Sequence, residues 1–138
     1  MNVYLDTSAL LRLALRERGA LGELRRADVL VSSELLAVES RRTIDRLRSQ
    51  GALSAKDAVR RLDIVSAWLE AVDLVLLRAP ILSRASEPMP LPLGTLDALH
   101  LATALVWRDR MNQPLVLATH DGALGLAARA FGLDVIGL

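Results

Sequence analysis

The chain has 138 residues, of which 52% are hydrophobic and 24% charged, with a formal net charge of +1. This length and composition predict a single folded domain spanning residues 1–138 and exclude a disordered chain. Cysteine is absent, so disulfides and thiolate metal sites are excluded. There is no signal-peptide pattern, and no charge-free stretch exceeds ten residues. We therefore expect a cytoplasmic protein without a membrane segment.

The near-neutral net charge argues against a protein that coats DNA by electrostatic attraction alone. Arginine nevertheless supplies 16 of the 17 basic residues, and eleven arginines precede position 62. Guanidinium groups suit contacts with phosphate, but arginines also occupy the solvent faces of ordinary helices. The candidates for phosphate contacts are Arg12, Arg16, Arg41, Arg42 and Arg46.

Short apolar runs alternate along the chain with longer segments of helical periodicity. In the first half we predict a strand at 2–5, a helix at 8–18, a short helix ending near 28, a strand at 29–31, helices ending near 49 and 70, and a strand at 72–77. In the second half we predict a short helix after Pro80, a loop at EPMPLPLG, a helix at 96–110, a strand at 115–118, a helix at 121–130 and a strand at 134–136.

Capping residues support these boundaries. Ser32 or Ser33, Ser54 and Thr95 each precede a helical pattern, where a hydroxyl can accept a free backbone N–H. Gly51 and Gly132 follow helical patterns and are expected to end them. Alternating strands and helices imply parallel strands covered on both faces. We therefore predict an α/β fold, a three-layer α/β/α sandwich with a short, mainly parallel central sheet.

Four acidic residues occupy positions where such a sheet would place a ligand, beyond the carboxyl ends of its strands. Asp6 directly follows the first strand, and Asp121 closely follows the fourth. Glu39 falls on the margin of the inner face of the helix that follows the second strand. Taken alone, each of the four acids is better explained by a structural role than by a catalytic one, as when a carboxylate caps a helix or lies at its start.

Asp97 is the most informative of the four, because its helix is apolar almost all round from 96 to 107. Such a helix is expected to be buried, and an unpaired buried carboxylate is costly. Converging carboxylates repel one another unless a cation neutralises them. Oxygen ligands without cysteine favour Mg²⁺ or Mn²⁺, which activate water and stabilise charge on a phosphodiester.

Four segments resemble, in order, the motifs of PIN-domain ribonucleases, specifically the VapC-like toxins of toxin–antitoxin modules. They are YLDTSALL, SSELLAVESRR, LDALHLATAL and LATHDGALGLAARAFGL. The resemblance implies a PIN-like fold and a metal-dependent endoribonuclease. It further implies that Asp6 and Asp97 are the principal ligands of Mg²⁺, with Mn²⁺ as an alternative, and that Glu39 and Asp121 are supporting acids.

The same resemblance implies an RNA substrate, a homodimer and inhibition by a small VapB-like antitoxin. It places Ser8 and Thr119 where the family often has hydroxyl residues that orient the pocket, although either can equally serve as a helix cap. The number of metal ions stays open at one or two.

Other phosphate chemistries fit the sequence less well. A haloacid-dehalogenase-type phosphatase needs a second aspartate where Ser8 stands, and a receiver domain needs a lysine after a late strand, whereas Lys56 begins a mid-chain helix. No Gly-rich nucleotide loop is present. The remaining alternative is a catalytically silent PIN-like domain that binds RNA or a protein, and the presence of all four acids argues against it.

Overall fold

Strands and helices alternate along the chain, and five parallel strands form one sheet in the order β3-β2-β1-β4-β5. The computed structural model describes all residues, 1–138. The strands are β1 (Asn2–Leu5), β2 (Val29–Ser33), β3 (Asp73–Val75), β4 (Val116–Ala118) and β5 (Asp134–Ile136). The third strand is thus shorter than the predicted 72–77, and the predicted fifth strand is present.

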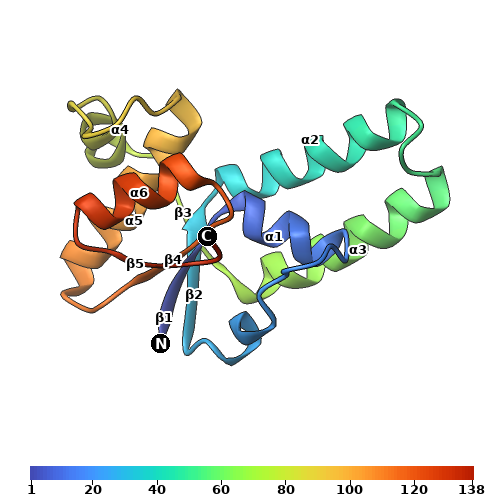
Figure 1. Ribbon diagram of the computed structural model, residues 1–138, viewed down its shortest axis with the longest axis horizontal. Coiled ribbons are helices and arrows are strands. Elements are labelled where there is room, and N and C mark those ends of the chain that lie inside the picture. Colours follow the sequence, from blue (N-terminus) through green and yellow to red (C-terminus); the bar gives the residue numbers. More distant parts are fainter.

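Helices cover both faces of this sheet. They are α1 (Thr7–Ala14), α2 (Leu35–Ser49), α3 (Ala55–Ala71), α4 (Ala79–Ala85), α5 (Thr95–Met111) and α6 (Gly122–Ala130), with a 3₁₀ helix η1 (Gly22–Arg26). Figure 1 shows α1, α2 and α3 on one side of the strands and α4, α5 and α6 on the other. The predicted three-layer α/β/α architecture is confirmed.

The side-chain alternation of β1 explains the two layers. Successive strand residues point to opposite faces, and Val3 and Leu5 pack in the core beneath α1, α2 and α3. Tyr4 points the other way, into the core beneath α5 and α6. All three side chains are fully buried, as expected for the central strand of a sheet covered on both faces.

The predicted helix starts are partly confirmed. Ser54 is the N-cap of α3, and its hydroxyl accepts the N–H of Asp57 at 3.1 Å. Thr95 was expected to cap the next long helix, but it is the first residue of α5, and Gly94 is the N-cap. The prediction for Thr95 is therefore wrong, and Gly94 offers no side chain to cap the helix in its place.

The two serines before α2 belong to β2 rather than to the helix cap. The hydroxyl of Ser33 still accepts the N–H of Leu35 at 3.1 Å, so it satisfies one free donor at the helix start. The hydroxyl of Ser32 instead donates to the carbonyl of Leu5 at 2.7 Å, which ties β2 to β1.

The predicted helix ends are confirmed at two glycines. Gly51 and Gly132 have φ values of +76° and +78°, which a glycine adopts without strain. The first helix, expected to reach residue 18, ends at Ala14. Arg16 has a φ of +55°, which no residue inside a right-handed helix can have.

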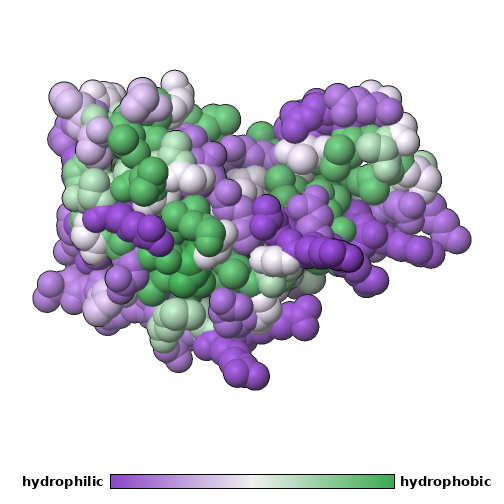
Figure 2. Space-filling view, viewed as in Figure 1, coloured by the Kyte–Doolittle hydropathy of each residue, from purple (hydrophilic) through white to green (hydrophobic).

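The surface differs between the two sides of the molecule. Hydrophilic residues predominate along the outer edge of the α2–α3 hairpin, whereas hydrophobic residues gather over α6 (Figure 2). Leu126 on α6 and the terminal Leu138 are each 54% exposed. None of the helices has the length and apolar character needed to cross a lipid bilayer.

Two leucines of α6 offer a matched test of the core beneath α5 and α6. Leu124 is fully buried there, whereas Leu126 is 54% exposed. We expect Leu124→Ala to lower the free energy of unfolding by about 2–5 kcal/mol, because it removes buried apolar contacts and leaves a cavity. Leu126→Ala should change it by less than about 0.5 kcal/mol. Urea unfolding followed by circular dichroism measures both, and equal effects would contradict the packing described.

Candidate functional site

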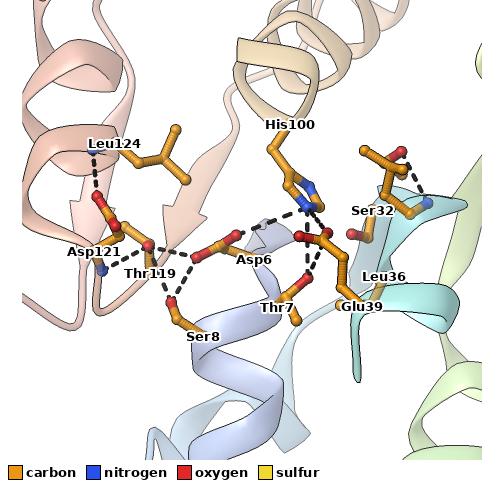
Figure 3. Close-up of polar contacts among 12 residues, drawn as sticks. Asp6, Thr7, Ser8, Ser32, Leu36, Glu39, His100, Thr119, Asp121 and Leu124 are labelled. Atoms are coloured by element: carbon orange, nitrogen blue, oxygen red, sulfur yellow. Dashed lines mark hydrogen bonds and ion pairs between the residues drawn. The ribbon is translucent and has the colours of Figure 1, made fainter. Parts of the chain in front are cut away.

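The carboxyl ends of β1 and β4 lie side by side. Leu5 pairs in register with Ala118, and the N–H of Asp6 donates to the carbonyl of Ala118 at 3.0 Å. Asp6 and Thr119 therefore leave the sheet at the same level although 113 positions separate them. This edge of the sheet brings together side chains from distant segments of the chain (Figure 3).

Asp6 is nearly buried, with 4% of the residue exposed. Its Oδ2 accepts hydrogen bonds from the hydroxyls of Ser8 at 2.5 Å and Thr119 at 2.7 Å. The other oxygen, Oδ1, accepts no hydrogen bond and lies 4.0 Å from Nε2 of His100. Both hydroxyls that the sequence singled out thus orient Asp6, and they do so through one oxygen only.

The loop after β4 holds Asp121 beside this pair. The N–H of Asp121 donates to the hydroxyl of Thr119 at 3.0 Å. Its Oδ1 accepts the N–H of Leu124 at 2.8 Å, which makes Asp121 the N-cap of α6. The other oxygen, Oδ2, makes no hydrogen bond. Asp121 therefore caps a helix with one oxygen and leaves the second without a partner.

The C-terminal residues support the same loop. The side chain of His120 is hydrogen bonded through Nδ1 to the carbonyl of Gly137 at 2.6 Å. Gly137 has a φ of +101° and packs so closely against the backbone oxygen of Thr119 that a Cβ atom would not fit. A glycine is therefore required where the chain passes behind the loop that carries Asp121.

Glu39 reaches the site from α2, with 22% of its side chain exposed. Its Oε1 is shared by two partners, the hydroxyl of Thr7 at 3.0 Å and Nε2 of His100 at 2.5 Å. Burial raises the pKa of Glu39, but the hydrogen bond and charge of His100 and the hydroxyl of Thr7 outweigh it, so the pKa is lowered. Glu39 is thus held as a carboxylate, and its Oε2 has no partner.

Asp97 lies in the first turn of α5, and its side chain makes no hydrogen bond. Burial raises its pKa, and so do the negative charges of Asp121, Asp6 and Glu39, whereas His100 acts in the opposite direction. The net pKa is raised, first by burial and then by the charges of the neighbouring carboxylates. The structure thus brings together all four acids that the sequence predicted.

His100 and Tyr4 also take part in this site, although neither of them was assigned to it from the sequence. His100 is 1% exposed, and its Nδ1 lies 2.7 Å from the hydroxyl of Tyr4. Burial lowers the pKa of His100. Hydrogen bonding to Glu39 and the charges of the nearby carboxylates raise it by more than burial lowers it, so the net pKa is raised. Burial also raises the pKa of the Tyr4 hydroxyl well above its ordinary value. The available signal was His100 three positions after Asp97, one turn along the same apolar helix.

The donor set fits a hard divalent cation that keeps part of its water shell. Asp6, Glu39 and Asp121 each have one oxygen bound by protein donors and one without a partner, and both oxygens of Asp97 lack one. No three acidic or imidazole side chains lie close enough to form a ready-made metal cage. Mg²⁺ binds in this manner, through one or two carboxylates plus water and phosphate oxygens.

A largely apolar pocket lies elsewhere, between η1, β2 and α3. Its volume is about 380 Å³, and it is lined by Leu24, Arg25, Ala27, Asp28, Leu30, Ala67, Trp68 and Ala71. None of the four clustered acids lines it, so it is separate from the candidate site.

The sequence and the fold of this chain match a known family. Residues 3–125 match the PIN domain, so the chain belongs to the PIN-domain family, and the predicted resemblance is confirmed. It is 38% identical over 138 positions to ribonuclease VapC46 of Mycobacterium tuberculosis (strain ATCC 25618 / H37Rv), covering 97% of this chain and 95% of the relative. The crystal structure of PAE2754 from Pyrobaculum aerophilum has the same fold, with a TM-score of 0.63 and 20% identity, covering 99% of this chain and 84% of that one.

The crowding of charge around Asp97 predicts that removing its charge stabilises the chain. The folded state raises its pKa above the ordinary 3.8, so ionised Asp97 opposes folding at neutral pH. We expect Asp97→Asn to raise the free energy of unfolding at pH 7 in EDTA by a few tenths to about 1 kcal/mol, because solvent screens this partly exposed group. The gain should disappear below pH 3.8, where Asp97 is protonated in both states.

Urea unfolding across this pH range measures the difference. Asp63→Asn is the control, since Asp63 is an exposed aspartate of α3 that forms no ion pair. A variant no more stable than wild type at pH 7 would show that the four charges do not repel one another as described.

Proposed function

We propose that this chain is a metal-dependent endoribonuclease that hydrolyses RNA phosphodiester bonds, acting in the cytoplasm as the toxin of a toxin–antitoxin pair. One observation carries the proposal: four acids lie near one edge of the sheet, and each has at least one carboxylate oxygen without a hydrogen-bond partner. They are Asp6, Glu39, Asp97 and Asp121. Membership of the PIN-domain family and the relative named as a ribonuclease support it. Residues 1–138 act as a single domain in this proposal.

The four acids have different roles in this proposal. Asp6 and Asp97 are the principal ligands of Mg²⁺ or Mn²⁺, and Glu39 and Asp121 are the supporting acids. The ion supplies Lewis acidity, which activates water and stabilises the charge that develops on a phosphodiester. Ser8 and Thr119 fix the orientation of Asp6, so that its Oδ1 is presented without a change of rotamer. Metal binding would also offset the repulsion that raises the pKa of Asp97.

The arginines of α2 supply a surface for the RNA backbone. Arg46 follows Glu39 by seven positions, two helical turns or about 10 Å along the same face. It is exposed and forms no ion pair, whereas Arg42 pairs with Asp45 at 3.0 Å. Arg41 and Arg16 are likewise without an acidic partner, but Arg12 lies 3.7 Å from Glu17. Arg46 is thus the free guanidinium best aligned with Glu39.

The first experiment is cleavage of a mixed RNA pool by purified protein with Mg²⁺, Mn²⁺ or EDTA. We expect wild type to cut RNA with either ion and not in EDTA. Asp97→Asn should lose at least about 100-fold in rate, because it removes a proposed metal ligand. Asp63→Asn should retain the wild-type rate. A protein that binds RNA but never cuts it would support the catalytically silent alternative, and equal cutting by wild type and Asp97→Asn would refute the assignment of Asp97.

We further propose that the chain forms a homodimer and binds a small VapB-like antitoxin that covers the active site. Exposed apolar side chains around α4 support a homodimer surface: Leu76, Leu82 and Leu96 are 49%, 46% and 48% exposed. Leu82 also lines an open groove with Leu93 and Leu99. Apolar surface of this kind is typical of faces that another chain covers.

Sedimentation velocity tests the dimer surface without reference to catalysis. We expect wild type to sediment as a dimer of the 15.0 kDa chain and Leu82→Arg to sediment as a monomer, because a charge cannot be buried unpaired at an interface. Val59→Arg is the matched control and should stay dimeric, because Val59 is 57% exposed on α3, on the other side of the sheet from α4. A monomeric wild type, or a dimeric Leu82→Arg, would count against this surface.

A further inference from the structure

The orientation of Glu39 depends on two donors that bind a single oxygen. Both Thr7 and His100 bind Oε1, at 3.0 and 2.5 Å, and neither binds Oε2. Figure 3 shows Oε1 turned towards these two residues and the second oxygen on the side where Asp6 lies. A glutamate side chain has three rotatable bonds, so fixing one oxygen determines where the other points.

His100 is itself held by a residue from β1. Its Nδ1 lies 2.7 Å from the hydroxyl of Tyr4, and the two rings meet edge to face, with centroids 5.9 Å apart and planes at 79°. The Tyr4 hydroxyl also accepts the backbone N–H of Ser33 at 3.1 Å. All three residues are buried, at 0%, 0% and 1% exposure for Tyr4, Ser33 and His100.

The direction of these hydrogen bonds follows from the backbone. The N–H of Ser33 can only donate, so the Tyr4 oxygen accepts it and the Tyr4 proton is available for His100. In the neutral ring Nδ1 then accepts from Tyr4, which places the ring proton on Nε2, where it donates to Oε1 of Glu39. Nε2 also carries a proton in the imidazolium form, so His100 is a donor to Glu39 in both states.

We propose that His100 and Tyr4 are positioning residues that fix Glu39, so that its Oε2 faces the cation site shared with Asp6 and Asp97. A series of hydrogen bonds connects the backbone of β2 to the carboxylate proposed to face the metal, through buried groups only. It runs from Ser33 N–H through Tyr4 O–H and His100 Nε2–H to Oε1 of Glu39. This inference rests on the proposed function, because it assigns a role in holding the metal. Residues that orient metal ligands from behind in this way are known to affect metal affinity about 10- to 100-fold.

The test measures Mn²⁺ binding by electron paramagnetic resonance of the free ion, with no RNA present. His100→Leu removes one of the two donors to Oε1 of Glu39 and leaves the hydroxyl of Thr7, whereas Tyr4→Phe removes only the hydroxyl that orients His100. His100→Gln provides a side-chain amide N–H in place of Nε2–H. Ser40→Ala is the matched control, because Ser40 is a fully buried neighbour of Glu39 whose hydroxyl bonds the carbonyl of Leu36 instead.

We expect the Kd for Mn²⁺ to rise about 10- to 100-fold in His100→Leu and by a smaller factor in Tyr4→Phe. It should return towards the wild-type value in His100→Gln and stay within about twofold of it in Ser40→Ala. Circular dichroism confirms the folded state of each variant, and if His100→Leu does not fold, Tyr4→Phe decides the question.

Unchanged Mn²⁺ affinity in folded His100→Leu and Tyr4→Phe would overturn the positioning role while leaving the nuclease proposal intact. An affinity that falls equally in Ser40→Ala would also overturn it, since any disturbance of the core would then suffice. A wild-type protein that neither binds Mn²⁺ nor cuts RNA would instead refute the proposed function itself. RNA cleavage measured on the same preparations separates these outcomes.

Discussion

The parallel pairing of β1 with both β2 and β4 determines where chemical groups can gather in this protein. From β1 the chain moves to β2 and β3 on one side of the sheet, and then returns to β4 and β5 on the other. The carboxyl end of β1 is therefore the point at which the strand order reverses, where open α/β sheets bind ligands. Asp6 stands at this point, and Thr119 lies next to it because Leu5 and Ala118 pair in register. The order of the strands, rather than any local motif, thus assembles the candidate site.

The charge at this edge is not neutralised by the protein's own cations. The chain has 17 lysine and arginine residues, yet none of them forms an ion pair with any of the four acids, and His100 is the only basic side chain within 4.0 Å of their carboxylate oxygens. Hydroxyl and backbone donors orient the acids instead, and neutral donors fix geometry without cancelling charge. The repulsion that results is balanced by the two apolar cores packed against the faces of the sheet. An edge of this kind is suited to an external cation.

Most of the architecture could be predicted from the sequence, because it follows from periodicity and from the positions of glycines and hydroxyls. The alternating strands, the cap at Ser54 and the four acids all follow from local patterns. The end of the first helix did not, since nothing in the local sequence shows that Arg16 adopts a left-handed conformation. The contact of His100 with Glu39 spans 61 positions, and that with Tyr4 spans 96. Such contacts depend on how α2, α5 and β1 pack, which a local pattern does not encode.

Helix α5 shows why one acid differs from the others. Because this helix is buried, each of its polar side chains in the core needs a partner within the protein. Thr103 donates to the carbonyl of Leu99 at 2.6 Å, and both ring nitrogens of His100 have partners. Asp97, which is only partly buried in the first turn of α5, has none, and burial and the neighbouring acids raise its pKa. The core polar groups of α5 are therefore satisfied, whereas the carboxylate of Asp97 is unpaired and is repelled by its neighbours. The stability lost there is the physical basis for expecting the strongest response to a bound cation at Asp97.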